Sequence, residues 1–246
     1  MMIGILTSEP GCGKSYAGLQ WEEPIISFDM ENRLDEKIDR FFKEKQIVNT
    51  PLAKYDSEHN IDEVASFDAF VAEIKKLPGR KPLPKTIFID GIGELRDYAI
   101  PKWAKLNNRK RPSNPGDWEQ VNNMVRDILF PLINWSRYLK LTQNYDINLI
   151  FTSQLKDDYT VIERNGKSES AKCGRIPSHK DWISYNVDLL VDLWMPCGKN
   201  GKPDGRYMAS VIKSPIGVFE VDLTPVRTEN GVIEVSLYEK LLEKGL

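Results

Sequence analysis

The residues with the most evident chemistry lie near the start of the chain, in the stretch SEPGCGKS at residues 8–15. An apolar run, residues 2–6, precedes this stretch and an amphipathic segment follows it, so the expected order is strand, loop and helix. The two glycines allow backbone N–H groups to turn inward around a phosphate. Lys14 would reach the β- and γ-phosphates, and the Ser15 hydroxyl would bind Mg²⁺. The stretch therefore predicts a phosphate-binding loop.

The loop departs from the usual pattern at its first position, which is Ser8 in place of glycine. Because a Cβ atom restricts φ, we expect the backbone at Ser8 to avoid the left-handed region. The residues expected to contact a bound nucleotide are Pro10, Gly11, Cys12, Gly13, Lys14, Ser15 and Tyr16.

A second element of the same chemistry is the stretch TIFIDGIGEL, an apolar strand that ends at Asp90. A carboxylate at this place can hold Mg²⁺ through Ser15 or a water molecule. In AAA+ ATPases and many helicases a glutamate follows directly and acts as general base. Here the next residue is Gly91, so the base must come from another part of the chain or be absent.

Glu31 is the candidate for this role, because it lies two residues beyond the apolar strand predicted over 25–29. A carboxylate there can orient and deprotonate a water that attacks the γ-phosphate. The alternative is that Asp29 and Glu31 only begin a helix and favour its dipole. Gln154, at the end of the stretch LIFTSQ, has an amide that can hydrogen-bond a γ-phosphate and report its presence.

The elements that must position these residues alternate along the chain. Helical patterns follow residue 14 and cover 62–79, 117–141 and the C-terminal residues, with Asp117 as candidate cap of the long helix. Loops are expected over 47–60, 98–117 and 156–181, and three late strands over 187–195, 207–214 and 218–224. Alternation of strands and helices predicts an α/β fold with a mostly parallel sheet, helices on both faces and antiparallel strands added at one edge. In such a sheet, ligands bind at the carboxyl ends of the strands.

Composition limits the remaining possibilities. The chain has 246 residues and a net charge of −2, so any binding of nucleic acid must depend on local patches. Its three cysteines are isolated and it has two histidines, which argues against a disulfide framework or a zinc site. No apolar run approaches the ~18 residues of a membrane helix. We expect a cytoplasmic protein, with one domain over 1–246 that ends in a short hairpin and helix over 219–246.

Together, the stretches SEPGCGKS, IISFDMEN, TIFIDGIGEL and LIFTSQL resemble the core of the RecA/RadA recombinase superfamily. The size is similar to that of the core-only RecA-like proteins of phages and archaeal viruses, which include single-strand annealing recombinases. The resemblance covers roughly residues 1–225. It implies a three-layer RecA-like P-loop NTPase core that binds ATP and Mg²⁺. By this resemblance the site residues are Lys14 and Ser15 on phosphate and Mg²⁺, Glu31 as base, Asp90 as Mg²⁺ aspartate, Gln154 as γ-phosphate sensor and Lys213 reaching a neighbouring subunit's ATP.

In this superfamily the loops after the aspartate strand and after the glutamine bind DNA. The corresponding stretches here carry basic residues, and Trp103 would serve as a stacking platform for bases. A charged surface that only faces solvent is the alternative, as it is for Lys213. The residues expected to bind single-stranded DNA are Lys102, Trp103, Lys105, Arg109, Lys110 and Arg111 in the first loop, and Arg164, Lys167, Lys172 and Arg175 in the second.

The resulting hypothesis is a Mg²⁺-dependent ATPase that binds single-stranded DNA and acts in recombination, annealing or replication of a phage, virus or mobile element. It implies a homo-oligomer, as a ring or short filament, a single-strand-binding protein as a candidate partner, and no membrane association. Two alternatives stay open. One is a nucleotide or small-molecule kinase with residues 156–181 as its lid. The other is a nucleotide-gated adaptor or loader with little hydrolysis.

Overall fold

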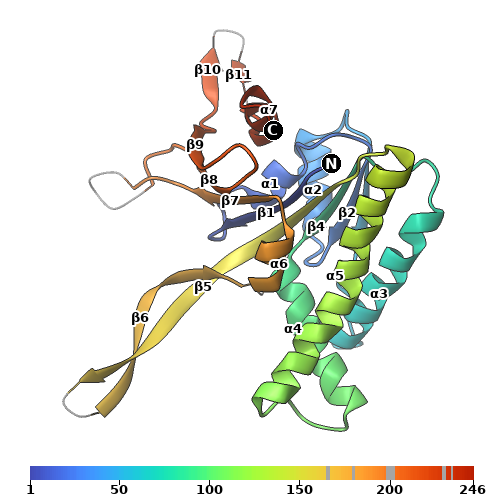
Figure 1. The fold of residues 1–246 in the computed structure, drawn as a ribbon, viewed down its shortest axis with the longest axis vertical. Helices are drawn as coiled ribbons and strands as arrows, with labels where there is room; N and C mark the ends of the chain where they lie inside the picture. The colour runs from blue at the N-terminus through green and yellow to red at the C-terminus, as the bar shows by residue number, and fades with distance from the viewer. Residues whose placement is uncertain (165–166, 179–180, 198–202, 229–230, 234) are drawn as a thin grey trace.

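One sheet of nine strands runs through the described part of the chain, in the order β3-β2-β4-β5-β1-β7-β8-β9, with β6 added on β5 (Figure 1). Neighbours from β3 to β7 are parallel, and β8 and β9 are antiparallel at one edge. The strands are β1 (Ile3–Ser8), β2 (Ile25–Asp29), β3 (Ile47–Pro51), β4 (Thr86–Asp90), β5 (Asn148–Arg164), β6 (Lys167–Pro177), β7 (Leu189–Trp194), β8 (Met208–Lys213) and β9 (Phe219–Asp222). A separate hairpin joins β10 (Val226–Thr228) to β11 (Gly231–Ile233).

The computed structural model describes residues 1–246 except 165–166, 179–180, 198–202, 229–230 and 234. Within residues 157–176, 181, 226–228 and 231–233 it describes the backbone only. The helices are α1 (Lys14–Gly18), α2 (Leu34–Phe41), α3 (Glu63–Lys76), the 3₁₀ turn η1 (Leu77–Gly79), α4 (Ile92–Leu106), α5 (Pro115–Gln143), α6 (Asp181–Asn186) and α7 (Leu237–Glu243). Among these helices, none combines the length and the apolar composition needed to span a membrane.

The helices cover both faces of the sheet, so the molecule has three layers. Alternate residues of a strand point to opposite faces. Ile87 and Ile89 of β4 therefore join the core under α3, α4 and α5, whereas Phe88 joins the core with α1, α2 and α7. This arrangement confirms the expected α/β class, with three layers, a mostly parallel sheet and antiparallel strands added at one edge.

The prediction of a loop over 47–60 is wrong at its start, where β3 pairs in parallel with β2. This strand has the sequence IVNTP, which is short and ends in proline. Val48 is exposed, so the strand lacks the apolar alternation that marks a buried strand. Its place at the sheet edge depends on backbone pairing with β2, which the sequence pattern does not reveal.

The prediction of a loop over 98–117 is also wrong, because α4 continues to Leu106 and α5 begins at Pro115. Pro101 suggested a break, yet it lies inside α4. Tyr98 and Trp103, on either side of it, are buried in the core. Burial of this apolar face outweighs the helix-breaking cost of about 3 kcal/mol for an interior proline.

The long helix α5 is capped by a different residue from the one expected. The side chain of Asn114 accepts a hydrogen bond from the backbone N–H of Asp117, so Asn114 is the cap. Asp117 lies in the first turn, where its carboxylate accepts hydrogen bonds from Ser113 and Arg109.

The polar segment over 156–181 is mostly a hairpin, not a loop, and α6 begins at its last residue. β5 continues ten residues beyond Gln154, and β6 returns antiparallel to it. The sequence has Asn165-Gly166 midway, which is the strongest short signal of a hairpin and went unused in the prediction.

The register of the parallel strands decides which residues meet at their carboxyl ends. Ser8 on β1 is level with Gln154 on β5, and Asp29 on β2 is level with Asp90 on β4. These four residues therefore lie together at the carboxyl ends of the strands, where ligands bind in a sheet of this kind.

The segment after the short helix α1 is secured by one lysine. Lys45 donates hydrogen bonds to the carbonyl oxygens of Gln20 and Trp21, both at 2.9 Å, and to that of Leu19 at 3.4 Å. Burial lowers the pKa of Lys45, and the charge of Glu23 opposes this shift. A single ammonium group thus satisfies three carbonyls in the segment that directly follows α1.

We expect Lys45→Met to lower the free energy of unfolding by about 1–3 kcal/mol, because the apolar stem stays while the donors are lost. Urea unfolding followed by circular dichroism measures the change. Lys43→Met is the matched control, since Lys43 is exposed on the same segment. Equal losses of stability in the two variants would contradict this role of Lys45.

Candidate active site

The loop between β1 and α1 forms an open cradle. Gly11 and Gly13 both have φ of 85°, and a Cβ atom added at either would find no atom within 4 Å. Backbone with this φ is readily adopted only by glycine, and it turns the N–H groups toward a common point. The fold thus keeps free the space that a phosphate group needs.

Lys14, the first residue of α1, lies folded over this cradle. Its ammonium donates to Ser8 Oγ at 2.8 Å and to the carbonyl oxygens of Ser8 and Glu9 at 3.2 and 3.1 Å. Burial lowers the pKa of Lys14, while the nearby charges of Asp90, Glu94 and Glu31 act in the opposite direction. A partly desolvated cation at this place is well suited to bind an anion.

Ser8 fits its position for two reasons. It is the last residue of β1 and has no positive φ, as expected for a residue with a Cβ. Its buried hydroxyl donates to the carbonyl oxygen of Glu9 at 2.6 Å and accepts the hydrogen bond from Lys14. The Ser8 hydroxyl therefore both stabilises the loop and positions the Lys14 ammonium group.

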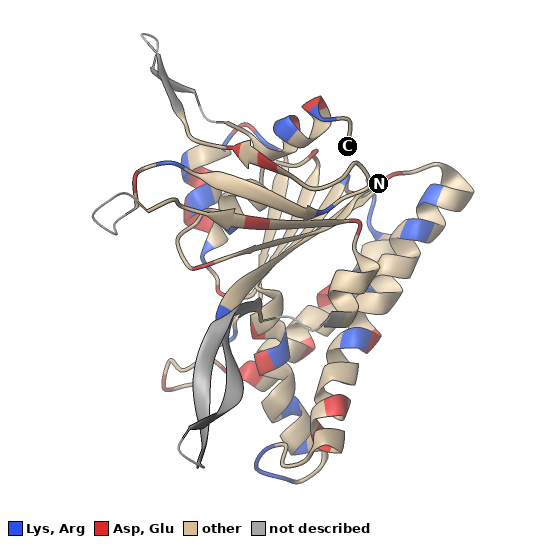
Figure 2. Ribbon diagram, turned by 60° about the vertical axis from the view of Figure 1, so that its left-hand side comes forward, with Lys and Arg blue, Asp and Glu red and all other residues tan. Residues whose placement is uncertain are grey.

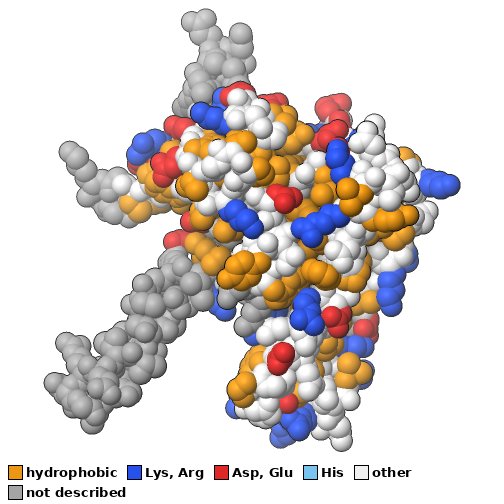
Figure 3. All heavy atoms as spheres, in the orientation of Figure 1, with side chains coloured by type: hydrophobic (Ala, Val, Ile, Leu, Met, Phe, Trp, Pro, Cys, Tyr) orange, Lys and Arg blue, Asp and Glu red, His pale blue; other side chains and the backbone are white. Residues whose placement is uncertain are grey.

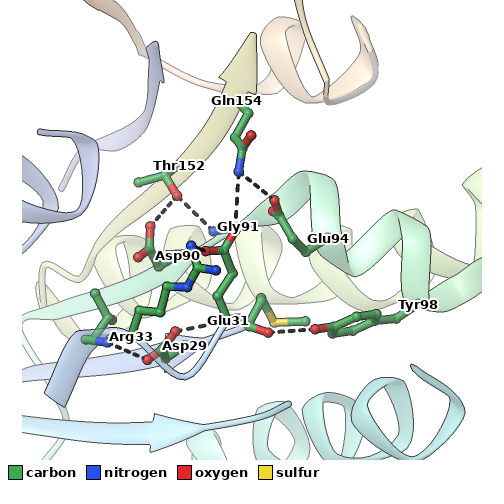
Figure 4. Close-up of polar contacts among 11 residues, drawn as sticks. Asp29, Glu31, Arg33, Asp90, Gly91, Glu94, Tyr98, Thr152 and Gln154 are labelled. Carbon is green, nitrogen blue, oxygen red and sulfur yellow. Dashed lines mark hydrogen bonds and ion pairs between the residues drawn. The ribbon is translucent and has the colours of Figure 1, made fainter. Parts of the chain in front are cut away.

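Asp90 lies at the carboxyl end of β4, next to the cradle. Burial raises its pKa, and hydrogen bonds from Thr152 and Ser15 lower it. Thr152 Oγ1 donates to Asp90 Oδ1 at 2.6 Å and accepts from the backbone N–H of Gly91 at 2.8 Å (Figure 4). Thr152, which the sequence did not single out, thus orients this carboxylate from the neighbouring strand.

The donor set fits Mg²⁺ bound together with phosphate. Ser15 and Asp90 offer a hydroxyl and a carboxylate oxygen, which are hard ligands of the kind that Mg²⁺ prefers. Among the described residues there is no group of three or more His, Cys, Asp or Glu that could hold a metal ion. This chemistry matches an ion that shares its ligands with substrate phosphates and water.

Asp29 shapes the segment that carries Glu31. It is buried, and its carboxylate accepts hydrogen bonds from the backbone N–H groups of Leu34 at 2.7 Å and Glu31 at 3.1 Å. Burial raises the pKa of Asp29, and these hydrogen bonds oppose the shift. Asp29 thus stabilises the start of α2. This is the alternative role that was considered for both Asp29 and Glu31.

Glu31 itself points into the site (Figure 4). Its Oε1 accepts a hydrogen bond from Gln154 Nε2 at 3.3 Å, and its Oε2 pairs with Arg33 at 3.0 Å. A third of the Glu31 side chain is exposed, so water can reach the carboxylate.

Glu94, in the first turn of α4, is a site residue that the sequence prediction missed. Gln154 Nε2 also donates to Glu94 Oε1, at 3.0 Å. Burial raises the pKa of Glu94 to about 7, with a further contribution from the charge of Glu31. The signal was an acidic residue four positions after Asp90 in the same stretch, one helical turn beyond the end of the strand.

Lys213 lies away from this chain's phosphate-binding loop. It is level with Leu190 near the amino end of β7, whereas the loop follows the carboxyl end of β1. Its ammonium donates to the carbonyl oxygen of Ser184 in α6 at 2.9 Å. Lys14, Glu31, Asp90 and Gln154 are therefore brought together and Lys213 is not, and their roles stay predictions.

The basic residues near the end of α4 have different surroundings. Trp103 is only 2% exposed and donates to Gln120 at 2.9 Å, so the prediction that it is a platform for bases is wrong. Lys102 pairs with Asp68 at 2.7 Å, and Arg109 pairs with Asp117 at 2.9 Å. The residues of this group that are exposed are Lys105, Arg109, Lys110 and Arg111.

These exposed cations lie at and beside the turn between α4 and α5, at one end of the molecule (Figures 2 and 3). The second expected group, Arg164, Lys167, Lys172 and Arg175, falls on the β5–β6 hairpin. The side chains of that group lie outside the described part of the structure.

A cavity of about 410 Å³ adjoins the phosphate-binding loop. Four residues expected to contact nucleotide line it, namely Gly11, Cys12, Gly13 and Tyr16, together with Phe41, Tyr207 and Leu223. Its walls are mainly apolar and aromatic, which suits the flat face of a nucleobase.

Comparisons with known proteins were made for the sequence and for the fold. A family model described as "AAA domain" matches residues 2–208. No curated protein matches the sequence. One solved structure with a similar fold is the flagellar accessory protein FlaH from Methanocaldococcus jannaschii, with 12% identity and a TM-score of 0.42, covering 95% of this chain and 88% of that one.

We expect Gly13→Ala to weaken nucleotide binding at least about tenfold, because a residue with a Cβ is strained at this φ and occupies the cradle. Titration with a fluorescent ATP analogue measures the affinity. Gly79→Ala is the matched control, since Gly79 has no positive φ and open space around its Cβ position. Unchanged affinity in Gly13→Ala would rule out the cradle as the phosphate site.

Proposed function

The chain belongs to the AAA domain family of P-loop ATPases, and we propose that it hydrolyses ATP with Glu31 as general base and that single-stranded DNA regulates this turnover. The observation that carries the proposal is the meeting of Lys14, Glu31, Asp90 and Gln154 at the carboxyl ends of adjacent parallel strands. Each has the chemistry that one part of the reaction requires.

Each group of site residues has its own role in the proposed reaction. The cradle and Lys14 bind the phosphates, and Ser15 and Asp90 hold Mg²⁺, directly or through water. When bound, Mg²⁺ neutralises charge on the β- and γ-phosphates. Glu31 takes the proton of the attacking water, and its partial exposure leaves room for that water.

Gln154 supports the recognition of the γ-phosphate. Its amide is within hydrogen-bonding distance of Glu31, and its strand is level with Ser8 of the phosphate-binding loop. Beyond Gln154 the same strand continues into the β5–β6 hairpin, which projects from the body of the molecule (Figure 1). A movement of Gln154 on ATP binding can therefore be transmitted to the hairpin through the backbone of β5.

The DNA part of the proposal is supported by α4. This helix begins in the site, with Glu94 in its first turn, and ends beside the exposed cations at Lys105, Lys110 and Arg111. Its fifteen residues span ~22 Å at 1.5 Å per residue. DNA phosphates bound at the far end can thus act on the site through one continuous element. Under this proposal the protein acts in recombination, annealing or replication of DNA.

We expect Glu31→Gln to reduce ATP turnover roughly 10²–10⁴-fold while the affinity for ATP changes little, because only the proton acceptor is lost. Steady-state hydrolysis with Mg²⁺, with and without single-stranded DNA, measures this. Glu36→Gln is the control, since Glu36 is exposed on α2. Turnover that survives in Glu31→Gln would exclude Glu31 as the base, and turnover that requires a small acceptor would favour a kinase.

We expect the double variant Lys110→Ala/Arg111→Ala to bind single-stranded DNA more weakly, with the slope of log affinity against log salt reduced by about 0.7 for each phosphate that the protein no longer neutralises. Fluorescence anisotropy at several salt concentrations gives the slope. Lys43→Ala/Lys244→Ala makes the same change in net charge at exposed positions elsewhere. If the two double variants behave alike, the α4–α5 turn is not the DNA site.

A further inference from the structure

The amide of Gln154 is shared by two carboxyl groups from different parts of the fold (Figure 4). Nε2 donates to Glu94 Oε1 at 3.0 Å and to Glu31 Oε1 at 3.3 Å. An amide nitrogen has two hydrogens, so both are engaged in this arrangement. Gln154 therefore has no N–H left for a phosphate unless one of these hydrogen bonds breaks.

Glu94 is the less satisfied of the two acceptors. Its Oε2 is buried and has no hydrogen-bond donor among the described residues. Glu31, by contrast, has Arg33 as a second partner. A buried acceptor without a donor is costly, so Glu94 depends on the Gln154 amide, and breaking this hydrogen bond costs free energy.

The fold makes a specific place for this carboxyl group. A Cβ atom on Gly91 would lie 2.7 Å from Glu94 Oε2, so a larger residue after Asp90 would displace this carboxyl group. The Glu94 carboxyl thus lies beside the position where other ATPases have their adjacent glutamate, but it comes from α4. Its contact is with Gln154 and not with the metal aspartate.

Charge in the site favours an exchange when a triphosphate enters. The acidic groups facing this region are Glu31, Asp90 and Glu94, and the buried cation among them is Lys14. A γ-phosphate brings strong acceptor oxygens to the strand end where Gln154 lies. It competes with Glu94 for the same amide hydrogens.

We propose that Glu94 is a positioning residue that holds the Gln154 amide away from the γ-phosphate until ATP binds. The inference rests on the proposed function, because it requires ATP in this site. ADP has no γ-phosphate and leaves the Gln154–Glu94 hydrogen bond intact. Binding of ATP, but not of ADP, therefore carries the cost of breaking it, and Glu94 lowers the preference of the protein for ATP over ADP.

The test compares Kd values for a non-hydrolysable ATP analogue and for ADP, with Mg²⁺, by calorimetry on the full chain. We expect Glu94→Ala to raise the preference for the ATP analogue about fivefold, the effect of one hydrogen bond. Glu94→Gln should stay near wild type, because its amide oxygen still accepts from Gln154. In a Gln154→Ala background, adding Glu94→Ala should leave the preference unchanged.

Two results would overturn the inference. An equal gain in Glu94→Gln and Glu94→Ala would show that charge alone acts, and a gain that persists without Gln154 would show that the amide is not the target. If the wild type binds neither nucleotide, the proposed function fails together with the inference. If it binds ATP without hydrolysing it, hydrolysis is removed from the proposed function, while the ratio of affinities still decides the role of Glu94.

Discussion

The constraint on which the rest of the structure depends is the parallel pairing of the buried strands β2, β4, β5 and β1. Their register sets Asp29 level with Asp90 and Ser8 level with Gln154. Successive residues of a strand point to opposite faces, so a shift of one residue in any pairing would turn a functional side chain away from the site. The two hydrophobic cores that pack on opposite faces of the sheet therefore also fix the positions of the polar side chains at the carboxyl ends of its strands.

The polar residues at this edge depend on one another more than on solvent. Thr152 on β5 orients Asp90 on β4, and Ser8 on β1 holds Lys14. Gln154 joins Glu31 to Glu94 across two further elements. Burial raises the pKa of Asp90 and Glu94, and it lowers that of Lys14. In each case burial disfavours the charged form of the side chain. A bound ligand can therefore replace the internal hydrogen bonds of the site with its own.

The helix α4 connects the site with the exposed cations at its other end. Its first turn supplies Glu94 to the site, and its middle buries Tyr98 and Trp103 in the core beneath the sheet. Tyr98 also donates a hydrogen bond to the carbonyl oxygen of Met30 at 2.7 Å, next to Glu31. The helix is thus fixed beside the segment that carries Glu31, while its far end carries exposed cations. One continuous helix thus connects the two ends without any loop between them.

The sequence by itself determined the phosphate-binding loop, the strand that ends at Asp90 and the strand that ends at Gln154. In these places a run of buried apolar residues is followed at once by small or polar ones, and that pattern is local. The order of elements also predicted the class of fold, because short parallel strands need helical crossovers.

Only the tertiary structure decided the surroundings of Trp103, Glu94 and β3. Trp103 lies in a stretch rich in proline and basic residues, yet packing against the core made it helical and buried. Glu94 became part of the site because α4 begins beside Gln154, a residue sixty positions away. β3 exists because β2 offers it backbone partners. Each outcome depends on contacts between distant segments, whose free energy outweighs the local preferences that a sequence pattern records.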